Sequence, residues 1–359
     1  MVKLILALVL IAGLVFFLLP KKPLEIIKPV FLEGKNIITK PEKPSYIEKI
    51  PAIDQIFSPG HNQISSFPKE KLRTIIATGD IIPARSVNFQ ANIRKDFKWP
   101  YLETAQILKS ADITFINLET PLFPNCPLTN EGMIFCGDAG NLEGLKYSGV
   151  DIASLANNHA GNFGKEGVQK TYDLLVKNRV LVTGVNGPVV MDIRGLKFAF
   201  LGYNDITKPQ PGISNADEEK IKSEILKAKK IADVVIVAFH WGVEYQDQPD
   251  ERQKYLARFA IDAGADLIIG NHPHWIQPVE VYKNKLITYA HGNFIFDQEW
   301  SLKTKQGVVG KYTFYDKTLI DAEFFPIQIE DFGQPHFLEG EEKIKILEAM
   351  KVQSQNLVK

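Results

Sequence analysis

Near its C-terminal third the chain carries Gly270-Asn-His-Pro-His-Trp275, followed by Tyr289-Ala-His-Gly-Asn-Phe294. These two stretches hold three of the seven histidines. The apolar run Asp266–Gly270 comes directly before the first stretch and is typical of a buried strand. Open α/β sheets bind ligands beyond the carboxyl ends of their strands, so a ligand site is expected here. For the His272–His274 pair alone, turn histidines hydrogen-bonded to backbone are the alternative.

Length and charge limit the function classes. A chain of 359 residues can bury one large core or two modest ones. Lys+Arg and Asp+Glu both count 42, so no net positive field favours nucleic acid, and no nucleic-acid partner is expected.

The N-terminus carries an unbroken apolar run, Leu4–Leu19, behind Lys3 and before Lys21 and Lys22. With Pro20, the run reaches the lower limit of a membrane span, about 17 residues. No small-x-small cleavage site follows it, which favours an uncleaved single-pass membrane anchor over residues 1–22. The lysines lean toward a cytoplasmic C-terminal side, but long domains translocate despite such charges.

Beyond the anchor, the proline-spaced segment 23–71 predicts a semi-extended stalk. Strands and helices alternate over 72–330, which predicts an α/β domain with mostly parallel pairing and some hairpins. Residues 331–359 are expected to form a C-terminal helix and tail. Expected helices include Tyr101–Ser110 and Asp250–Ala263, the second closed by Gly264.

Polar side chains of metal-ligand type follow five of the predicted strands, and we expect them to meet at the same end of one sheet. They are Asp80, Glu119, Asn158 with His159, His240, and His272 with His274. Carboxylates and imidazoles together suit Zn, Mn or Fe. The set exceeds the needs of one tetrahedral zinc, so it indicates a dinuclear site. Taken singly, Asp80 as a cap, Asn158 as a turn former and His240 as a core residue are the alternatives.

Six ordered motifs resemble those of the CapA/PgsA-type capsule (poly-γ-glutamate) biosynthesis proteins, and the resemblance covers about 72–330. They are Gly79-Asp-Ile-Ile-Pro-Ala-Arg85, Asn117-Leu-Glu119, Ser154-Leu-Ala-Asn-Asn-His-Ala160, His240-Trp-Gly-Val-Glu-Tyr245, Gly270-Asn-His-Pro-His274 and Gly292-Asn-Phe294. Such proteins are similar to calcineurin-like metallophosphoesterases. The resemblance implies an α/β sandwich of sheets flanked by helices, with an N-terminal transmembrane helix and an extracytoplasmic domain.

The resemblance also implies roles for single residues, around two divalent ions. Asp80 resembles the first-strand ligand and Glu119 the bridging carboxylate, while the remaining ligands are Asn158, His240, His272 and His274. His159 resembles the imidazole that stabilises the transition state by donating to an oxygen. Arg85 and Glu244 are candidate substrate contacts, with surface ion pairs as the alternative. Asn293 of the Gly-Asn-Phe motif is a candidate accessory residue.

Three positions depart from the family pattern. Ile82 stands where a calcineurin-type Asp-x-His motif needs histidine, so one ion would lack a ligand. Asn162 replaces the usual aspartate after Asn-Asn-His-Ala-Gly. His291 stands where Ser-Leu usually precedes Gly-Asn-Phe, and a ligand, a proton donor and a local hydrogen-bonding group are its three open roles.

Cys126 and Cys136 are the only cysteines, in a loop rich in Pro, Asn and Gly just past Glu119. A disulfide in an oxidising compartment is the favoured interpretation, and two free thiols are the alternative. This pairing favours export of the domain.

The expected function is that of a membrane-anchored extracytoplasmic protein in capsule or poly-γ-glutamate biosynthesis. Its expected partners are the membrane, an anionic polymer or phosphoester substrate, and capsule-synthesis subunits. A metal-dependent phosphoesterase with an envelope substrate is one alternative. A non-catalytic subunit that binds polymer or partner proteins is the other.

Overall fold

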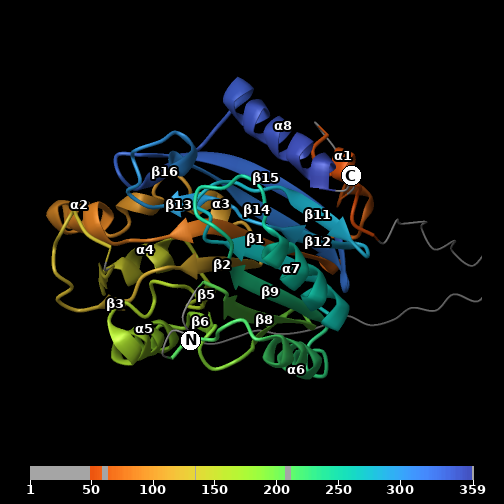
Figure 1. Cartoon of the computed structure of the whole chain (residues 1–359), viewed down its shortest axis with the longest axis horizontal. Helices are drawn as coiled ribbons and strands as arrows, with labels where there is room; N and C mark the ends of the chain where they lie inside the picture. Colours follow the sequence, from red (N-terminus) through yellow and green to blue (C-terminus); the bar gives the residue numbers. More distant parts are fainter. Residues whose placement is uncertain (1–48, 59–63, 134, 207–211, 358–359) are drawn as a thin grey trace, which may run out of the picture. The chain divides into compact units, whose positions relative to one another are not determined.

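The computed structural model describes residues 49–58, 64–133, 135–206 and 212–357. These described residues form one compact unit (Figure 1). The predicted anchor and most of the predicted stalk lie outside the described residues. Within the described ranges, no helix combines the length and the apolar composition that a bilayer span requires.

The first sheet has eight strands among the described residues, and its parallel half contains the strand that carries Asp80. Strands β1, β2, β5 and β6 run parallel, β13 adds to β1 in parallel, and β14, β15 and β16 continue the other edge in antiparallel pairing. Their bounds are β1 Leu72–Ile81, β2 Ile113–Leu118, β5 Ile152–Ser154, β6 Leu181–Thr183, β13 Asn293–Ile295, β14 Gln306–Tyr315, β15 Thr318–Glu330 and β16 Gln334–Phe337.

The second sheet has six strands in the order β11-β12-β10-β9-β8-β7 among the described residues. Strands β8, β9, β10 and β12 run parallel, while β7 and β11 pair antiparallel at the two edges. Their bounds are β7 Val189–Ile193, β8 Leu196–Asn204, β9 Val234–His240, β10 Leu267–Asn271, β11 Val279–Tyr282 and β12 Lys285–Thr288. A short pair outside both sheets, β3 (Leu122–Phe123) and β4 (Gly137–Asp138), borders the loop that holds the cysteines.

The two sheets pack face to face, because alternate side chains of each central strand point to opposite sides. In β1, Ile75 lies in the core between the sheets, while Ile76 lies in the core on the outer face. Across the inner core, Phe115 of β2 stacks on Phe200 of β8 with ring centroids 5.4 Å apart. Both faces of each central strand are therefore buried, which explains the nearly continuous apolar runs in the sequence.

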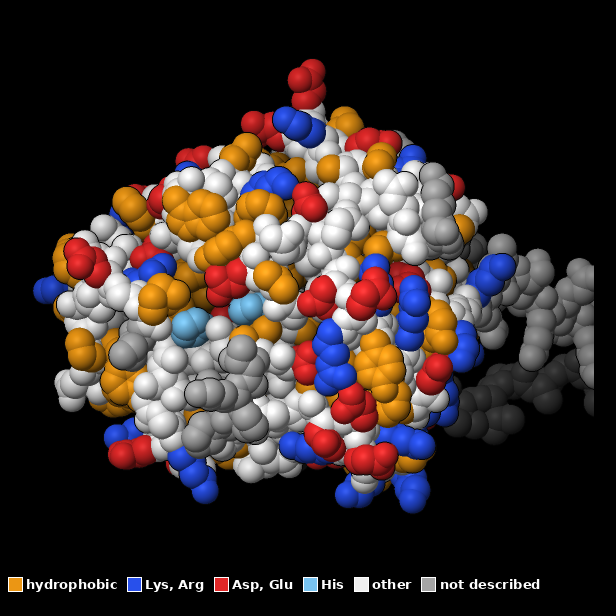
Figure 2. All heavy atoms as spheres, in the orientation of Figure 1, with side chains coloured by type: hydrophobic (Ala, Val, Ile, Leu, Met, Phe, Trp, Pro, Cys, Tyr) orange, Lys and Arg blue, Asp and Glu red, His pale blue; other side chains and the backbone are white. Residues whose placement is uncertain are grey.

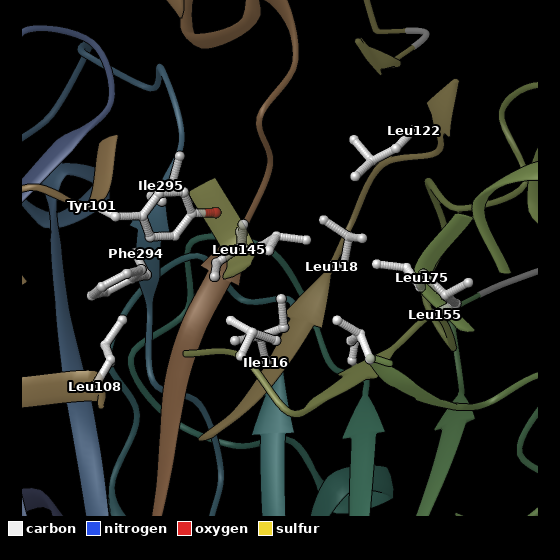
Figure 3. Close-up of a cluster of buried hydrophobic side chains, with 14 of the residues drawn as sticks. Tyr101, Leu108, Ile116, Leu118, Leu122, Leu145, Leu155, Leu175, Phe294 and Ile295 are labelled. Carbon is white, nitrogen blue, oxygen red and sulfur yellow. The ribbon is translucent and has the colours of Figure 1, made fainter. Parts of the chain in front are cut away.

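Helices cover the outer face of each sheet (Figure 1). On the first sheet, Leu145 of α4 (Asn141–Tyr147) and Leu175 of α5 (Gly164–Lys177) join the same cluster as Ile116 and Leu118 (Figure 3). On the second, α6 (Glu218–Ala228) and α7 (Glu251–Ala263) pack in the same way. The fold is thus a mixed α/β sandwich of two sheets flanked by helices, as the resemblance implied.

The prediction that all ligand-bearing strands end at one edge of one sheet is wrong. Strands β1, β2 and β5 belong to the first sheet, whereas β9 and β10 belong to the second. The sequence shows where parallel strands occur but not which of them pair, so a switch of sheets after β6 leaves no trace in it. The ligands still converge, because the two sheets face each other and their strand ends lie side by side.

The helix predicted over 250–263 is present as α7 (Glu251–Ala263), but the helix predicted over 101–110 is largely absent. A 3-10 turn at Trp99–Tyr101 and the single turn α3 (Ala105–Leu108) stand there instead. The sequence also gave no sign of α2 (Arg85–Arg94) or of the β11–β12 hairpin. The predicted C-cap at Gly264 is confirmed, since this glycine adopts φ 118° at the end of α7.

The packed unit extends beyond 72–330 at both ends. Ile50 and Ile56, the second in α1 (Ile53–Ile56), are buried in the core between the sheets. At the other end β16 pairs with β15, and α8 (Gly340–Leu357) buries Met350 against the same core. Ser354 of α8 accepts a hydrogen bond from the Val279 backbone N–H at 2.9 Å, which fixes the helix on edge strand β11.

Candidate metal centre

Five side chains from the ends of four strands meet where the two sheets face each other. Asp80 comes from β1 and Glu119 follows β2, while His240 ends β9 and His272 and His274 follow β10. All five are at most 4% exposed. The first sheet supplies the carboxylates and the second the imidazoles. Figure 2 shows histidine side chains at the surface in view, beside acidic and hydrophobic side chains.

Two groups of ligand atoms have the spacing of a metal site. Glu119, His272 and His274 offer atoms within 4.8 Å of one another, and so do Asp80, Glu119 and His240. Glu119 is the member that both groups share. Both groups therefore depend on this one carboxylate.

The atom Nε2 of His240 shows that the centre fits a cation. Asn158 Oδ1 lies 2.7 Å from it, His272 Nδ1 3.1 Å and Glu119 Oε1 3.2 Å. An imidazole nitrogen carries at most a single hydrogen, so it cannot satisfy three such neighbours. Glu119 Oε1 accordingly has no hydrogen-bond partner among the described residues although it is buried. A cation between these lone pairs would satisfy all of them.

The pKa shifts of the buried side chains also indicate that the centre lacks positive charge. Burial and the neighbouring charge of Asp80 raise the pKa of Glu119 well above its usual range. The pKa of His274 is raised to about 9, because its hydrogen bond to Asp80 and the charge of Glu119 outweigh burial. Burial lowers the pKa of His240 to about 3. A bound divalent ion would supply the positive charge that a proton on His274 otherwise provides.

Three asparagines orient the candidate ligands by hydrogen bonds. The sequence had assigned no role to two of them, Asn117 and Asn157. Asn117 Nδ2 donates to Asp80 Oδ1 at 2.8 Å, and its own Oδ1 accepts from Asn157 Nδ2 at 3.1 Å. The predicted accessory residue Asn293 accepts at Oδ1 from His274 Nδ1, 2.9 Å away. Asn117, Asp80 and Asn293 are Cα partners across β2, β1 and β13, so strand register builds this row. The Asn117-x-Glu119 spacing was its only signal in the sequence, since alternate strand residues share a face.

Backbone strain concentrates at the same place. His272 (φ 100°), His274 (φ 58°), Tyr245 (φ 62°) and Arg85 (φ 46°) all occupy the left-handed region. Non-glycine residues adopt it at a cost, and such residues gather at functional sites. The strain aims both imidazoles of the His-Pro-His turn toward the carboxylates.

The half-buried imidazole of His159 is held on two sides. Its Nδ1 lies 2.9 Å from Asn162 Oδ1, which also accepts the Phe135 backbone N–H at 2.7 Å. An atom that accepts from a backbone N–H is the amide oxygen, so Nδ1 of His159 carries the hydrogen and donates it. Burial lowers the pKa of His159 to about 4. His159 is therefore neutral with its hydrogen on Nδ1, and its Nε2 carries a lone pair.

The cysteine loop reaches this imidazole. Cys126 and Cys136 form a disulfide with Cα atoms 5.9 Å apart. Phe135, next to Cys136, stacks on His159 with ring centroids 4.1 Å apart. Among the described residues there is no free cysteine.

The remaining predicted residues lie around the centre. Arg85 forms an ion pair with Asp297, which sequence reasoning missed, and this pair is mostly buried rather than a surface pair. Glu244 is half-buried, and its charge contributes to the raised pKa of His274. His291 is hydrogen-bonded at both ring nitrogens, to the Thr78 carbonyl at 3.2 Å and the Tyr312 hydroxyl at 2.8 Å. Of its three open roles, local hydrogen bonding matches this geometry.

Ile82 offers no ligand. It is fully buried in an apolar cluster with Ala84, Phe135 and Phe296. The departure from the Asp-x-His motif is thus part of the packing beside the centre.

Comparisons with known proteins agree with this architecture. The family described as "Bacterial capsule synthesis protein PGA_cap" matches residues 74–298. The capsule biosynthesis protein CapA of Bacillus anthracis is 31% identical over 288 residues, which cover 74% of this chain and 69% of that protein. The PGA biosynthesis protein CapA of Bacillus subtilis (strain 168) is 31% identical over 271 residues, 70% of each.

Among solved structures, a novel phosphatase of Mycoplasma pneumoniae aligns with a TM-score of 0.50 and 18% identity, over 72% of this chain and 95% of that one. This similarity shows a shared fold. The resemblance carried by the six motifs is confirmed: the chain belongs to the bacterial capsule synthesis protein PGA_cap family.

Proposed function

We propose that this protein acts in the biosynthesis of a poly-γ-glutamate capsule and that its centre binds two divalent ions of Zn, Mn or Fe. The names of its CapA relatives support the capsule role. The single observation that carries the metal centre is the membership of Glu119 in both ligand groups. Asp80 and His240 complete one group, and His272 and His274 the other, while Asn158 Oδ1 faces the first group at His240 Nε2.

The chemistry that best fits the centre is hydrolysis or transfer at a phosphoester or amide bond. Divalent ions, when bound, act as Lewis acids on a phosphoryl or carbonyl oxygen and lower the pKa of water. His159 is neutral with Nε2 free to accept, so it is suited to take a proton from the attacking water. The Asn162 hydrogen bond keeps the proton of the resting imidazole on Nδ1 and thereby keeps Nε2 available.

The location that best fits these features is the outer side of the cell membrane. The apolar run over 4–19 supports a single-pass anchor, and the Cys126–Cys136 disulfide supports an oxidising compartment. Capsule-synthesis subunits and the anionic polymer are then the expected partners.

A second candidate function is a metal-dependent phosphoesterase with an envelope substrate, favoured by the shared fold with a phosphatase. Metal analysis of the full-length protein, paired with turnover of bis(p-nitrophenyl) phosphate and of γ-linked oligoglutamate, separates the candidates. Metal with oligoglutamate turnover supports the capsule enzyme, and metal with phosphodiester turnover supports the second candidate. Protein that binds no divalent metal would contradict both.

A further inference from the structure

A cavity of about 440 Å³ opens beside the metal centre. Its lining combines a charged pair, polar side chains and an aromatic and apolar wall, and includes Arg85, Asn130, Met133, Tyr245, Gln298 and Trp300. Trp300 and Met133 are 59% and 64% exposed, so this wall is open to a ligand. A cavity of this size with a few fixed polar groups is typical of a small-molecule or chain-end site.

The cavity is continuous with the centre through side-chain contacts. Gln298 Nε2 donates to the Tyr245 hydroxyl at 2.9 Å, and Gln298 Oε1 accepts from Asn293 Nδ2 at 3.2 Å. Asn293 in turn accepts from His274 Nδ1. Phe296, also in the lining, lies 5.3 Å from the His274 ring. A ligand in the cavity therefore lies next to whatever group the metal centre holds.

Arg85 is fixed in the cavity with donor capacity to spare. Its guanidinium lies 4.8 Å from the ring centroid of Phe135 and 5.0 Å from that of Phe296. Nε and Nη2 donate to Asp297 Oδ1, and Nη1 donates to the Gly132 carbonyl at 3.1 Å. One hydrogen on Nη1 and one on Nη2 have no acceptor among the residues that the structure describes. These two hydrogens match the two oxygens of a carboxylate.

Arg85 is not the only donor to the carboxylate of Asp297. The Asp297 Oδ2 accepts the Ser86 backbone N–H at 2.9 Å, at the first turn of α2. The carboxylate is thus shared between Arg85 and a helix N-terminus, which itself carries partial positive charge.

We propose that Arg85 binds the carboxylate of a γ-linked glutamyl unit in this cavity, next to the unit that reacts at the metal centre. The amide planes and methylene groups of the chain lie against Tyr245, Trp300 and Met133. This inference rests on the proposed function, because it assigns a subsite for the same polymer.

Isothermal titration of the full-length protein with γ-linked triglutamate tests the subsite, and the triamide that lacks all side-chain charge is the matched ligand. Arg85→Lys keeps the charge and the pair with Asp297 but loses the planar fork, so we expect at least about tenfold weaker binding. Arg258→Lys is the matched control variant. Arg258 likewise pairs with a buried carboxylate, Glu280, and lies over Tyr282, but it is not part of the cavity. We expect it to bind as the wild type does, and the triamide to bind weakly to every variant.

Equal affinity of the wild type and Arg85→Lys for triglutamate would overturn the subsite, as would equal affinity of the wild type for the triamide. The metal content of each variant distinguishes a failure of the subsite proposal from a failure of the proposed metal-dependent function. Glu119→Ala should lose metal and keep Arg85-dependent binding, whereas Arg85→Lys should keep metal. If the wild type contained no metal but still bound triglutamate in an Arg85-dependent way, the proposed metal centre would be contradicted and the subsite supported.

Discussion

Phe135 stacks on the imidazole of His159 with ring centroids 4.1 Å apart and an interplanar angle of 29°. The same residue donates its backbone N–H to Asn162 Oδ1, the acceptor of His159 Nδ1. Because Cys136 follows directly and is bonded to Cys126, the disulfide, the aromatic stack and the proton position of His159 form one connected assembly.

Removing the disulfide should therefore lower both stability and activity. Cys126→Ser with Cys136→Ser frees a short loop, and the free energy of unfolding should fall by about 2–3 kcal/mol. Urea denaturation measures the loss, and kcat reports the release of His159. Phe135→Leu keeps the disulfide and should lower kcat with a smaller effect on stability. A double serine variant with unchanged stability and kcat would contradict the assembly.

Asn162→Asp should move the acid limb of the pH–rate profile to higher pH. A carboxylate at this position would stabilise the imidazolium of His159 and raise its pKa from about 4. Since the neutral form accepts the proton, activity lost on acidification in the wild type near pH 4 should be lost at a higher pH in the variant. Asn162→Ala, which removes the hydrogen bond without adding charge, should lower kcat without that shift. Identical acid limbs in the wild type and Asn162→Asp would show that His159 is not the base.

Metal binding should release protons near neutral pH. His274 has its pKa raised to about 9, so it is protonated at pH 7.5 and must lose that proton before its nitrogen can bind an ion. Apparent metal affinity should accordingly rise with pH up to about 9 and level off above it. Titration calorimetry in buffers of different ionisation enthalpy counts the protons, with His274→Gln as the control. Binding that releases no proton at pH 7.5 would exclude this state of His274.

Gly79→Ala should distort the centre through the backbone. A Cβ at this residue would lie 2.3 Å from the Gly292 carbonyl oxygen, the group that accepts the Asp80 backbone N–H at 2.9 Å. Neither backbone can yield without moving Asp80, so we expect a loss of stability of about 1–3 kcal/mol together with weaker metal binding. Chemical denaturation and metal analysis measure the two effects. A variant with wild-type values in both would show that this strand approach does not position Asp80.

The sequence was sufficient to predict the candidate metal ligands that lie at strand ends. Asp80 and His240 could be found because an apolar run ends at each of them, and buried strands end at ligand sites in this class of fold. The division of the strands between two sheets could not be found, since the apolar pattern of β9 is the same in either sheet.

The residues that orient the site residues by hydrogen bonds could not be predicted from the sequence either. Asp297 contacts Arg85 from 212 positions away, and no local pattern marks such a pair. Asn117 was visible only as part of a motif, because its amide acts through register with Asp80. The proton position on His159 depends on a backbone N–H of a distant loop, which no side-chain pattern reports.

The most direct test of the metal centre is the metal content of Glu119→Ala beside that of His291→Ala, measured by mass spectrometry after both proteins are loaded with the same ion. Glu119 belongs to both ligand groups, whereas His291 uses its ring nitrogens on Thr78 and Tyr312. The prediction is that Glu119→Ala binds neither ion and that His291→Ala retains at least one. Full metal content in Glu119→Ala would contradict the account.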